Sequence, residues 1–469
     1  MSRTHTQTDA TEQAGGKRWG CLLYSACVVA VLMTLGVVAC FFWYGNAKSE
    51  LESEIARIAE RGEPLWFADL EPTEPPTPED DATPLFLAAS AKLKPAAQAF
   101  YDRLDAEPAT PLGVYDEFSA ALDANRPALK LMAEAVKRPY FRLPIDYQTK
   151  QPFNILLPEI QNSREFARLL RADVLQSLGA GDRDRAVAAV HECLGLSELF
   201  RDEPIIITQL VRYAIGSVAV ESLQTAVEHT ELTRDEFAAL DELLEQMERN
   251  CRLRPSIIAE RCGSFTSTHY FSENIGLFDS TNDSGEAGRI ARLLSSRFMQ
   301  PRLMSERAYN LRIMTEFADA VDLPGQQGIE AVRELDERVK SDTYTSHTLT
   351  RLLVPALVPY RNASLRFRQR LLNARLALRI NRYRAEHGKL PSTLAEILDD
   401  KLATAADVYT GQSLVYEMTA DGFMLYPAAE SLAETKPPAW KDDDAKKVNT
   451  FKAKFPQPAK SEAKSGQSP

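Results

Sequence analysis

The chain has 469 residues, a formal net charge of −11 and only six cysteines. This length allows two to three domains, and scarce glycine beside abundant Ala, Leu, Arg and Glu favours helices. A net negative charge argues against general affinity for nucleic acid. Six cysteines are too few for a disulfide scaffold, so a hydrophobic core has to hold the fold. We therefore expect a mainly α-helical protein without a nucleic-acid partner.

The N-terminal region contains the most distinctive segment. Residues 1–18 are polar and lack apolar periodicity, which predicts a disordered cytoplasmic tail. Residues 19–44 carry no charge, and within them residues 21–42 would span about 33 Å as a helix. That length matches a hydrocarbon core of roughly 30 Å, and aromatic rings at both ends suit the two interfaces. The segment predicts one transmembrane helix.

The flanking charges predict the orientation of this helix. Lys17 and Arg18 precede it, so the positive-inside rule places the N-terminus in the cytoplasm and the rest of the chain outside. We expect an uncleaved, single-pass anchor in the cell membrane. A cleaved signal peptide is one alternative, although its apolar core has about 7–15 residues. A lipoprotein with Cys40 as its lipidated N-terminus is another, although the residues that follow, 41–44, are apolar.

A spacer follows over residues 45–83. Apolar residues at i, i+4 and i+7 predict a juxtamembrane helix over Lys48–Arg61. The segment Glu71–Pro84 is rich in proline and acidic residues, which is typical of an extended linker. We expect the compact domain to begin near Leu85.

Residues 84–361 predict an all-α domain. Two amphipathic stripes flank the turn Gly179–Asp182 and predict a helical hairpin, which locally resembles one tetratricopeptide unit without a second copy at that period. A third apolar stripe covers Ile207–Val218, and Thr233–Glu236 forms a capping box that opens another helix. Three more helices are expected over Ala287–Met299, Pro301–Asp322 and Ile329–Lys340.

A long helix is expected from Asn362, within the module 362–430. Its apolar face is formed by Leu365, Leu372, Leu376, Ile380 and Tyr383. Residues 361–384 are also rich in arginine. These arginines could bind an anion or an acidic partner. We favour the other interpretation, a solvated helix face that pairs with the acidic remainder of the chain.

The end of this helix carries a family pattern. The sequence INRYRAEHGKLPSTLAEIL from Ile380 is followed by DVYTGQSLVY from Asp407 and DGFMLY from Asp421. Residues 372–427 resemble the C-terminal module of type II secretion pseudopilins of the major-subunit kind. The resemblance implies a local fold, a helix followed by a short helix and small antiparallel strands. Nothing near Gly20 matches a prepilin cleavage site, so assembly into a pilus is not expected.

The residues of this module fit that local fold. Gly388 suits the end of the helix, and Pro391 prevents its continuation. Thr393 and Glu396 have capping-box spacing, and the pair Asp421-Gly422 predicts a hairpin turn. Residues 431–469 are rich in Lys, Pro, Ser and Ala, which predicts a disordered tail.

A search for reactive side chains gives no assignment. None of the six histidines has a zinc-type spacing. His191 lies in an apolar stripe, which favours a core histidine, and Cys193 would point to another helix face. The segment Arg261–Tyr270 is interpreted as a polar helix end and loop. If it were helical, Cys262 and His269 would stand about 10.5 Å apart along the axis, too far for a nucleophile and its base.

The remaining polar motifs also fail as sites. Asp279–Gly285 is similar to a calcium loop, but the position that requires glutamate is Ile290. Asp442–Asp444 is interpreted as a solvated acidic run. Phosphate-loop, dinucleotide and nucleophile-elbow motifs are missing from the sequence. We therefore assign no catalytic, cofactor-binding or metal-binding residue, and we leave open whether Cys251 and Cys262 form a disulfide.

The sequence thus predicts a mainly α protein with one transmembrane helix, a helical-hairpin extracytoplasmic domain and a small α+β C-terminal module. The leading hypothesis is a membrane-tethered binding or scaffolding protein of a bacterial-type cell envelope, with an unidentified protein partner and no enzymatic activity. An envelope hydrolase whose site is not visible in the sequence is one alternative. A component associated with a secretion apparatus is the other.

Overall fold

Helices dominate the protein, and its strands form one small sheet near the C-terminus. The computed structural model describes residues 9–106, 112–273, 300–323, 325–341, 347, 350–351, 357–428 and 450–455. Two predicted features, the helix over Ala287–Met299 and the loop Asp279–Gly285, lie outside these residues. The mainly α fold with a small antiparallel sheet is confirmed.

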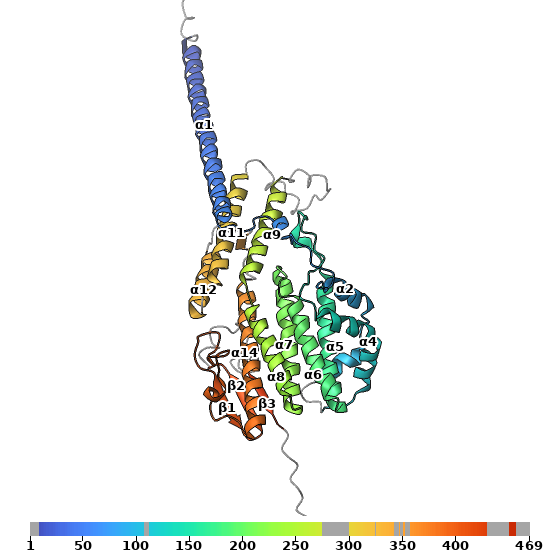
Figure 1. Ribbon diagram of the computed structural model, residues 1–469. Coiled ribbons are helices and arrows are strands. Elements are labelled where there is room, and N and C mark those ends of the chain that lie inside the picture. Colours follow the sequence, from blue (N-terminus) through green and yellow to red (C-terminus); the bar gives the residue numbers. More distant parts are fainter. Residues whose placement is uncertain are drawn as a thin grey trace, which may run out of the picture.

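The elements follow one another along the chain as Figure 1 shows. The helices and short 3-10 helices (η) are α1 (Asp9–Glu60), η1 (Phe67–Leu70), α2 (Thr83–Lys92), α3 (Gln98–Asp105), α4 (Asp116–Ala135), η2 (Pro152–Asn154), α5 (Pro158–Ala180), α6 (Arg183–Leu199), α7 (Ile206–His229), α8 (Arg234–Arg249), α9 (Arg254–Glu273), α11 (Gln300–Ala320), α12 (Gly325–Ser341), α14 (Leu357–His387) and η6 (Leu394–Ile397). The strands are β1 (Val415–Thr419), β2 (Gly422–Tyr426) and β3 (Phe451–Lys454).

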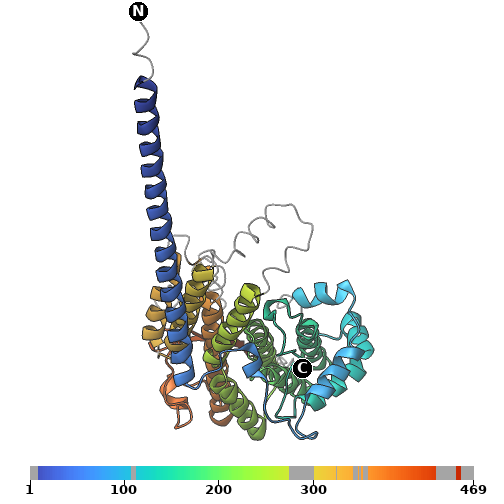
Figure 2. The ribbon, with the colours of Figure 1, turned by 90° about the horizontal axis from the view of Figure 1, so that it is seen from above.

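α1 is one continuous helix of 52 residues that projects from the body of the protein (Figures 1 and 2). It begins at Asp9, so the predicted disorder of residues 1–18 is wrong from that residue onward. It also includes most of the helix expected separately over Lys48–Arg61. No proline occurs between Asp9 and Glu60, so nothing in the sequence forces a break.

Two described helices are long and apolar enough to cross a membrane. One is the part of α1 from Cys27 to Glu60, whose most apolar window has no residue buried in the body. The other is α7, whose window is 67% buried and which is therefore a core helix. α1 is thus the candidate membrane anchor, and Cys40 lies inside it.

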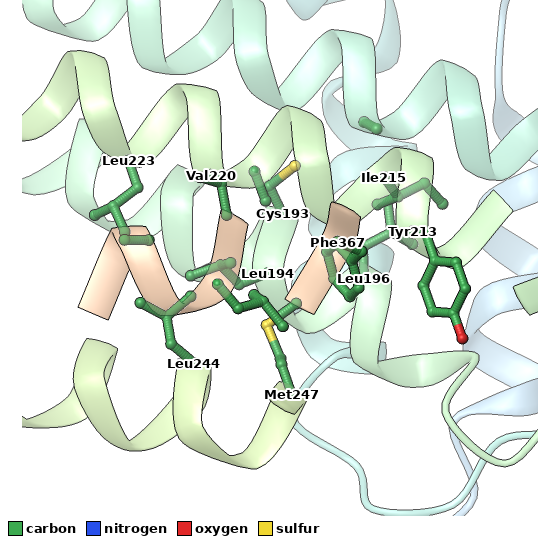
Figure 3. Packing of buried hydrophobic residues seen from close by; sticks show 14 of the residues in the cluster. Cys193, Leu194, Leu196, Tyr213, Ile215, Val220, Leu223, Leu244, Met247 and Phe367 are labelled. Atoms are coloured by element: carbon green, nitrogen blue, oxygen red, sulfur yellow. The ribbon is translucent and has the colours of Figure 1, made fainter. Parts of the chain in front are cut away.

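The core is built by α5, α6, α7, α8 and α14. The predicted hairpin is confirmed as α5 and α6, with Gly181 at a φ of 74° between them. The predicted capping box also forms, because the Glu236 carboxylate accepts a hydrogen bond from the Thr233 N–H at 2.7 Å. Figure 3 shows buried side chains from α6, α7, α8 and α14 meeting, among them Leu194, Leu223, Leu244, Met247 and Phe367.

α14 belongs to this same core. It begins at Leu357, five residues before the expected start, and packs against α7 and α8. The ring of Phe367 lies against Gly216 of α7, where an added Cβ would stand 2.4 Å from it. Residues of the two regions expected as separate, 84–361 and 362–430, therefore share one hydrophobic cluster.

The sheet has the order β1-β2-β3 with antiparallel pairs. Thr419 pairs with Gly422, so the hairpin turn is Ala420-Asp421 instead of the expected Asp421-Gly422. β3 lies in the region 431–469 that was expected to be a disordered tail, so that prediction does not hold for this strand. Its alternate residues are buried against β2 and α7, which provides the apolar surface that composition did not reveal.

The spacer 45–83 is built into the body and does not act as a loose linker. Leu51 and Ile58 of α1 pack with Phe265 of α9 and with Ala308 and Leu311 of α11. The expected extended segment Glu71–Pro84 is also held in place. Its backbone carbonyls at Pro78 and Asp81 accept hydrogen bonds from the Arg138 guanidinium at 2.8 and 2.7 Å.

A cluster of ion pairs joins the end of α1 to α9 and α11. Arg261 of α9 is completely buried, and its guanidinium donates to Glu63 at 2.8 Å and to Thr315 at 2.9 Å. Arg254 donates to Glu63 and, at 2.9 Å, to Asp319. Burial opposes ionisation of Glu63, but the hydrogen bonds from Arg261 and Arg254 outweigh it and lower the pKa of this carboxyl. We call these five residues the junction cluster.

The junction cluster generates the first prediction. The substitution Arg261→Met removes one of the three guanidinium groups that bond to Glu63, the others belonging to Arg254 and Arg61. Because Glu63 is partly exposed and keeps two partners, the cost should lie below the about 3–5 kcal/mol that breaking a fully buried pair typically costs. We therefore expect the full chain in detergent to unfold at a clearly lower urea concentration, measured by circular dichroism.

The matched control is Arg382→Met. The side chain of Arg382 is 47% exposed, and within the described ranges its carboxylate partner is its helix neighbour Glu386, a pair that contributes little to stability. Its unfolding midpoint should equal that of the wild type. Equal midpoints for both variants would remove the junction cluster as a stabilising feature.

Candidate functional site

One hollow on the body is an open cleft of 520 Å³ between α8, the end of α14 and η6. We call it the distal cleft. Charged side chains of both signs line it, among them Asp241, Arg379, Glu396 and Asp399. Because of its size and its converging carboxylates, we consider it first as a candidate catalytic site.

Several charged groups of the distal cleft pair with one another. The Arg379 guanidinium donates to Asp241 at 2.9 Å and to Asp399 at 2.6 Å, and the Tyr383 hydroxyl donates to Glu396 at 2.7 Å. The hydrogen bond from Tyr383 lowers the pKa of Glu396. Burial opposes ionisation of Asp399, but Arg379 outweighs it and lowers that pKa too. General acid catalysis needs a carboxyl with a raised pKa, which neither residue has.

The second hollow is an apolar groove that begins at the first turn of α7. It consists of two adjoining cavities of 160 and 250 Å³, which share Phe153, Ile207 and Glu260 in their linings. We call it the α7–α9 groove. Its other apolar lining residues include Leu157, Leu210, Met314 and Leu357. Five segments that are distant in the sequence therefore meet there, namely residues 152–157, α7, α9, α11 and α14, and Phe67 of η1 lines the smaller cavity beside them.

The groove presents unusually exposed apolar side chains. Phe153 is 51% exposed and Ile207 is 48% exposed, although both are large hydrophobic residues. The start of α7 is held in place by Glu260, whose carboxylate accepts a hydrogen bond from the Ile206 N–H at 3.4 Å. Rigid apolar walls that remain open to solvent are typical of a surface that binds something.

A small polar patch lies at one end of the groove. Asn310 is only 6% exposed, and its Oδ1 accepts a hydrogen bond from the Ser264 hydroxyl at 2.9 Å. Within the described part of the chain, the Nδ2 group of Asn310 has no hydrogen-bond partner. A buried donor without a partner costs about 1–3 kcal/mol, so native proteins seldom contain one. Asn310 lines the larger cavity of the groove, but its Nδ2 atom has almost no accessible surface and therefore lies behind the cavity wall.

Glu260 adds a titratable group to the same site. Burial raises the pKa of its carboxyl, and the hydrogen bond from the Ile206 N–H opposes this only in part. The groove thus combines apolar walls with one carboxyl that holds its proton more tightly than usual. This composition can bind an apolar segment.

The turn before α7 contains a second unusual carboxyl. Glu203 is 2% exposed, and one carboxylate oxygen accepts a hydrogen bond from the Leu143 N–H at 2.7 Å. Its other oxygen has no partner among the described residues. Burial raises the pKa of Glu203 to about 7. Its backbone carbonyl accepts from Gln209 at 2.7 Å, so this residue helps to fix the first turn of α7 and hence one wall of the groove.

The cysteines considered in the sequence prove to be structural. Cys193, Cys251 and Cys262 are all free thiols, so the disulfide left open between the latter two does not form. Burial raises the pKa of Cys193 and Cys262 to about 12 and that of Cys251 to about 11. Thiols with such high pKa values are poor nucleophiles.

The polar segment Arg261–Tyr270 lies within α9, so its interpretation as a helix end and loop is wrong. Hydroxyl groups in this segment can donate hydrogen bonds to the backbone carbonyl one turn earlier in the helix. The Thr268 hydroxyl does so to the Ser264 carbonyl at 2.7 Å. His269 contacts Arg307 at 3.2 Å. His191 is half-buried, and burial lowers its pKa.

Four arginines of residues 361–384 pair with carboxylates, namely Arg370, Arg375, Arg379 and Arg382, whereas burial lowers the pKa of Arg361 and Arg366. Arg375 is 3% exposed and donates to Asp241 and Glu248, at 3.0 Å each, and to Glu245 at 3.3 Å. Pairing with three carboxylates offsets the cost of burying this cation. Among the described residues, no cluster of His, Cys, Asp and Glu could hold a metal ion. Asp442–Asp444 lies outside them.

The groove was not foreseen from the sequence. Its walls come from five segments, and none has a motif by itself. The one local indication is the run Ile205-Ile206-Ile207 directly before Thr208, in which three successive apolar residues cannot all face the core of a helix.

Glu203 generates a prediction about pH. Its pKa is raised from 4.5 in the unfolded chain to about 7, so its contribution to stability is full below pH 4.5 and is lost as the pH rises through 7. The variant Glu203→Gln keeps an acceptor for the Leu143 N–H and does not titrate. Relative to this variant, the wild type should lose about 3 kcal/mol between pH 4.5 and pH 8.

The measurement is the urea midpoint of both proteins at pH 5 and pH 8. A wild type and a variant with the same pH dependence would show that Glu203 does not titrate near neutrality.

Comparison with known proteins does not assign the chain to a family. No protein-family model matches the chain, and searches of the curated proteins and of the solved structures also give no match. The pseudopilin resemblance of residues 372–427 is therefore neither supported nor contradicted by these comparisons. The function has to be inferred from the groove and the anchor.

Proposed function

We propose that this protein is a membrane-anchored, extracytoplasmic binding protein whose α7–α9 groove holds the apolar segment of a ligand. Two features support the proposal. α1 presents an apolar surface that is not buried by the body, as a membrane helix would. The groove presents apolar walls that remain exposed to solvent, as a binding site would.

The proposed orientation follows from the charges beside the apolar segment. Lys17 and Arg18 favour a cytoplasmic N-terminus, so the body and its groove would face the outside of a bacterial-type cell membrane. The junction cluster then holds the body in a fixed position relative to α1. A ligand bound in the groove would be held at a fixed distance from the membrane, which suits a binding or scaffolding role.

The exposed apolar walls are the observation that carries the proposal. Phe153 is 51% exposed and Ile207 is 48% exposed, and both line the groove. Large apolar side chains that stay exposed in a concave site are typical of a surface that binds a ligand.

Two other functions have weaker support. A component associated with a secretion apparatus rests on the resemblance of residues 372–427, and the helix, capped turn and small antiparallel sheet found there fit the fold that it implies. An envelope hydrolase would need a proton donor, but the carboxyls of the distal cleft have lowered pKa values. The groove therefore remains the better-supported site.

The groove generates a test with a neutral apolar fluorophore, N-phenyl-1-naphthylamine, and the full chain transferred into amphipol. The variant Ile207→Asp places a charge in the apolar wall and should weaken binding at least tenfold, which corresponds to about 1.4 kcal/mol. Fluorescence titration gives the affinity.

The matched control for this titration is Val114→Asp. Val114 is 59% exposed, comparable to Ile207, and does not line the groove. Its affinity for the fluorophore should be unchanged. If both variants bind like the wild type, the groove is not the binding site and the proposal fails.

A further inference from the structure

We infer that the α7–α9 groove takes a small apolar amine, whose protonated nitrogen binds the free carboxylate oxygen of Glu260. This inference rests on the proposed function and names the chemical class of the ligand. Three features of the groove support it: the charge of its lining, the position of Glu260 between the two cavities, and the volumes of these cavities.

Glu260 is the charged residue of the groove. Among the described residues that line the two cavities, it carries the one charged side chain. Its Oε1 atom accepts the hydrogen bond from the Ile206 N–H at 3.4 Å, and its Oε2 atom accepts none from the described part of the chain. Unlike the Nδ2 atom of Asn310, this unpaired oxygen keeps accessible surface. It is therefore open to a donor on a ligand.

No cation of the protein balances this carboxylate within the described ranges. Arg261 is its neighbour in the sequence, but the guanidinium of Arg261 bonds to Glu63 and Thr315 instead. Burial raises the pKa of Glu260, and among the described residues only the Ile206 N–H opposes this. A carboxyl with a guanidinium beside it has a lowered pKa, as Glu63 has. The charge of Glu260 thus lacks a counter-ion, which a cationic ligand would supply.

This carboxylate discriminates between apolar ligands. A ligand without a donor would cover Oε2 and remove it from water with no hydrogen bond in return, which costs about 1–3 kcal/mol and more for a charged group. An acidic ligand would place a second negative charge beside the first. A protonated amine donates to Oε2 and neutralises the charge. The groove should therefore prefer an amine to a hydrocarbon, an ether or an acid of the same size.

The aromatic rings beside Glu260 also suit a cation. Phe153 lines both cavities together with Glu260, and Phe67 lines the smaller one. The face of an aromatic ring attracts an ammonium group, with a gain of about 0.5–1 kcal/mol at exposed sites. These walls can therefore hold the charged nitrogen as well as its apolar substituents.

The position of Glu260 predicts where the nitrogen lies within the ligand. Glu260 lines both the cavity of 160 Å³ and that of 250 Å³, so a nitrogen bound to it has apolar space on two sides. A cavity of about 150 Å³ is large enough for benzene. The smaller cavity therefore fits one aromatic ring, and the larger one fits a ring with a short chain. The ligand that fits best is a secondary amine between two ring-sized apolar groups.

The test compares two ligands of the same shape, dibenzylamine and dibenzyl ether. The first is protonated at neutral pH, and the second has an ether oxygen, which cannot donate, in place of the nitrogen. Each is titrated at pH 7 into the full chain loaded with N-phenyl-1-naphthylamine, in a non-ionic amphipol that does not attract cations. Loss of fluorescence measures displacement. We expect dibenzylamine to displace the fluorophore from the wild type at a concentration at least tenfold lower than dibenzyl ether requires.

The variant Glu260→Gln keeps an acceptor for the Ile206 N–H and removes the charge. It should lose the preference for dibenzylamine, so that the two compounds displace the fluorophore at about equal concentrations. Its affinity for the neutral fluorophore should remain that of the wild type, which shows that the groove is intact. The matched control is Glu337→Gln, which changes an exposed glutamate of α12 outside the groove and should keep the full preference.

The outcomes separate this inference from the proposed function. Equal potency of the two compounds on the wild type, or no displacement by either, would overturn the amine inference. A preference that persists in Glu260→Gln would also overturn it, because the cation would then bind elsewhere. If the fluorophore titration still distinguishes Ile207→Asp from Val114→Asp in these cases, the binding function stands and the groove takes a ligand of another class. Failure of that titration would overturn both proposals.

Discussion

The ion pair between Glu63 and the buried Arg261 is the constraint on which the arrangement of this protein depends. Arg261 cannot stay buried without an anionic partner, so Glu63, three residues beyond the end of α1, and the middle of α9 have to meet. Thr315 completes the set of partners and draws α11 into the same alignment. Because α9 and α11 carry Ser264 and Asn310, the pair that fixes the anchor also fixes the position of the polar end of the groove.

The two hollows show why volume is a poor guide to function. The distal cleft is larger, but several of its charged groups pair with one another, as Arg379 does with Asp241 and Asp399. The α7–α9 groove is smaller, yet it keeps large apolar side chains such as Phe153 and Ile207 exposed. Exposed apolar surface is unfavourable in water, and its presence in a hollow is a better indication of a binding site than volume.

Local features were predictable from the sequence, whereas the site was not. The capping box at Thr233 and the glycine turn at Gly181 depend on residues within one or two turns, and both formed as predicted. Glu63 and Arg261 are 198 residues apart, and nothing in either neighbourhood identifies the other. β3 was similarly hidden, because its apolar partners lie on β2 and α7 instead of in its own segment. The periodicity of apolar residues shows which face of a helix or strand is buried, but it does not show which other element covers that face.

In the proposed membrane-anchored arrangement, the unbroken path of α1 into the body has a consequence for how the body is oriented within the plane of the membrane. An α-helix turns by about 100° for each residue. The number of residues between the apolar segment and Glu50, which accepts a hydrogen bond from Arg312 of α11, therefore sets the direction, around the axis of α1, in which the groove opens. One additional residue at Gly45, which has no neighbouring atom within 4 Å of its Cβ position, would turn the whole body by that angle. The length of this stretch therefore selects which lateral neighbours in the membrane the groove can face.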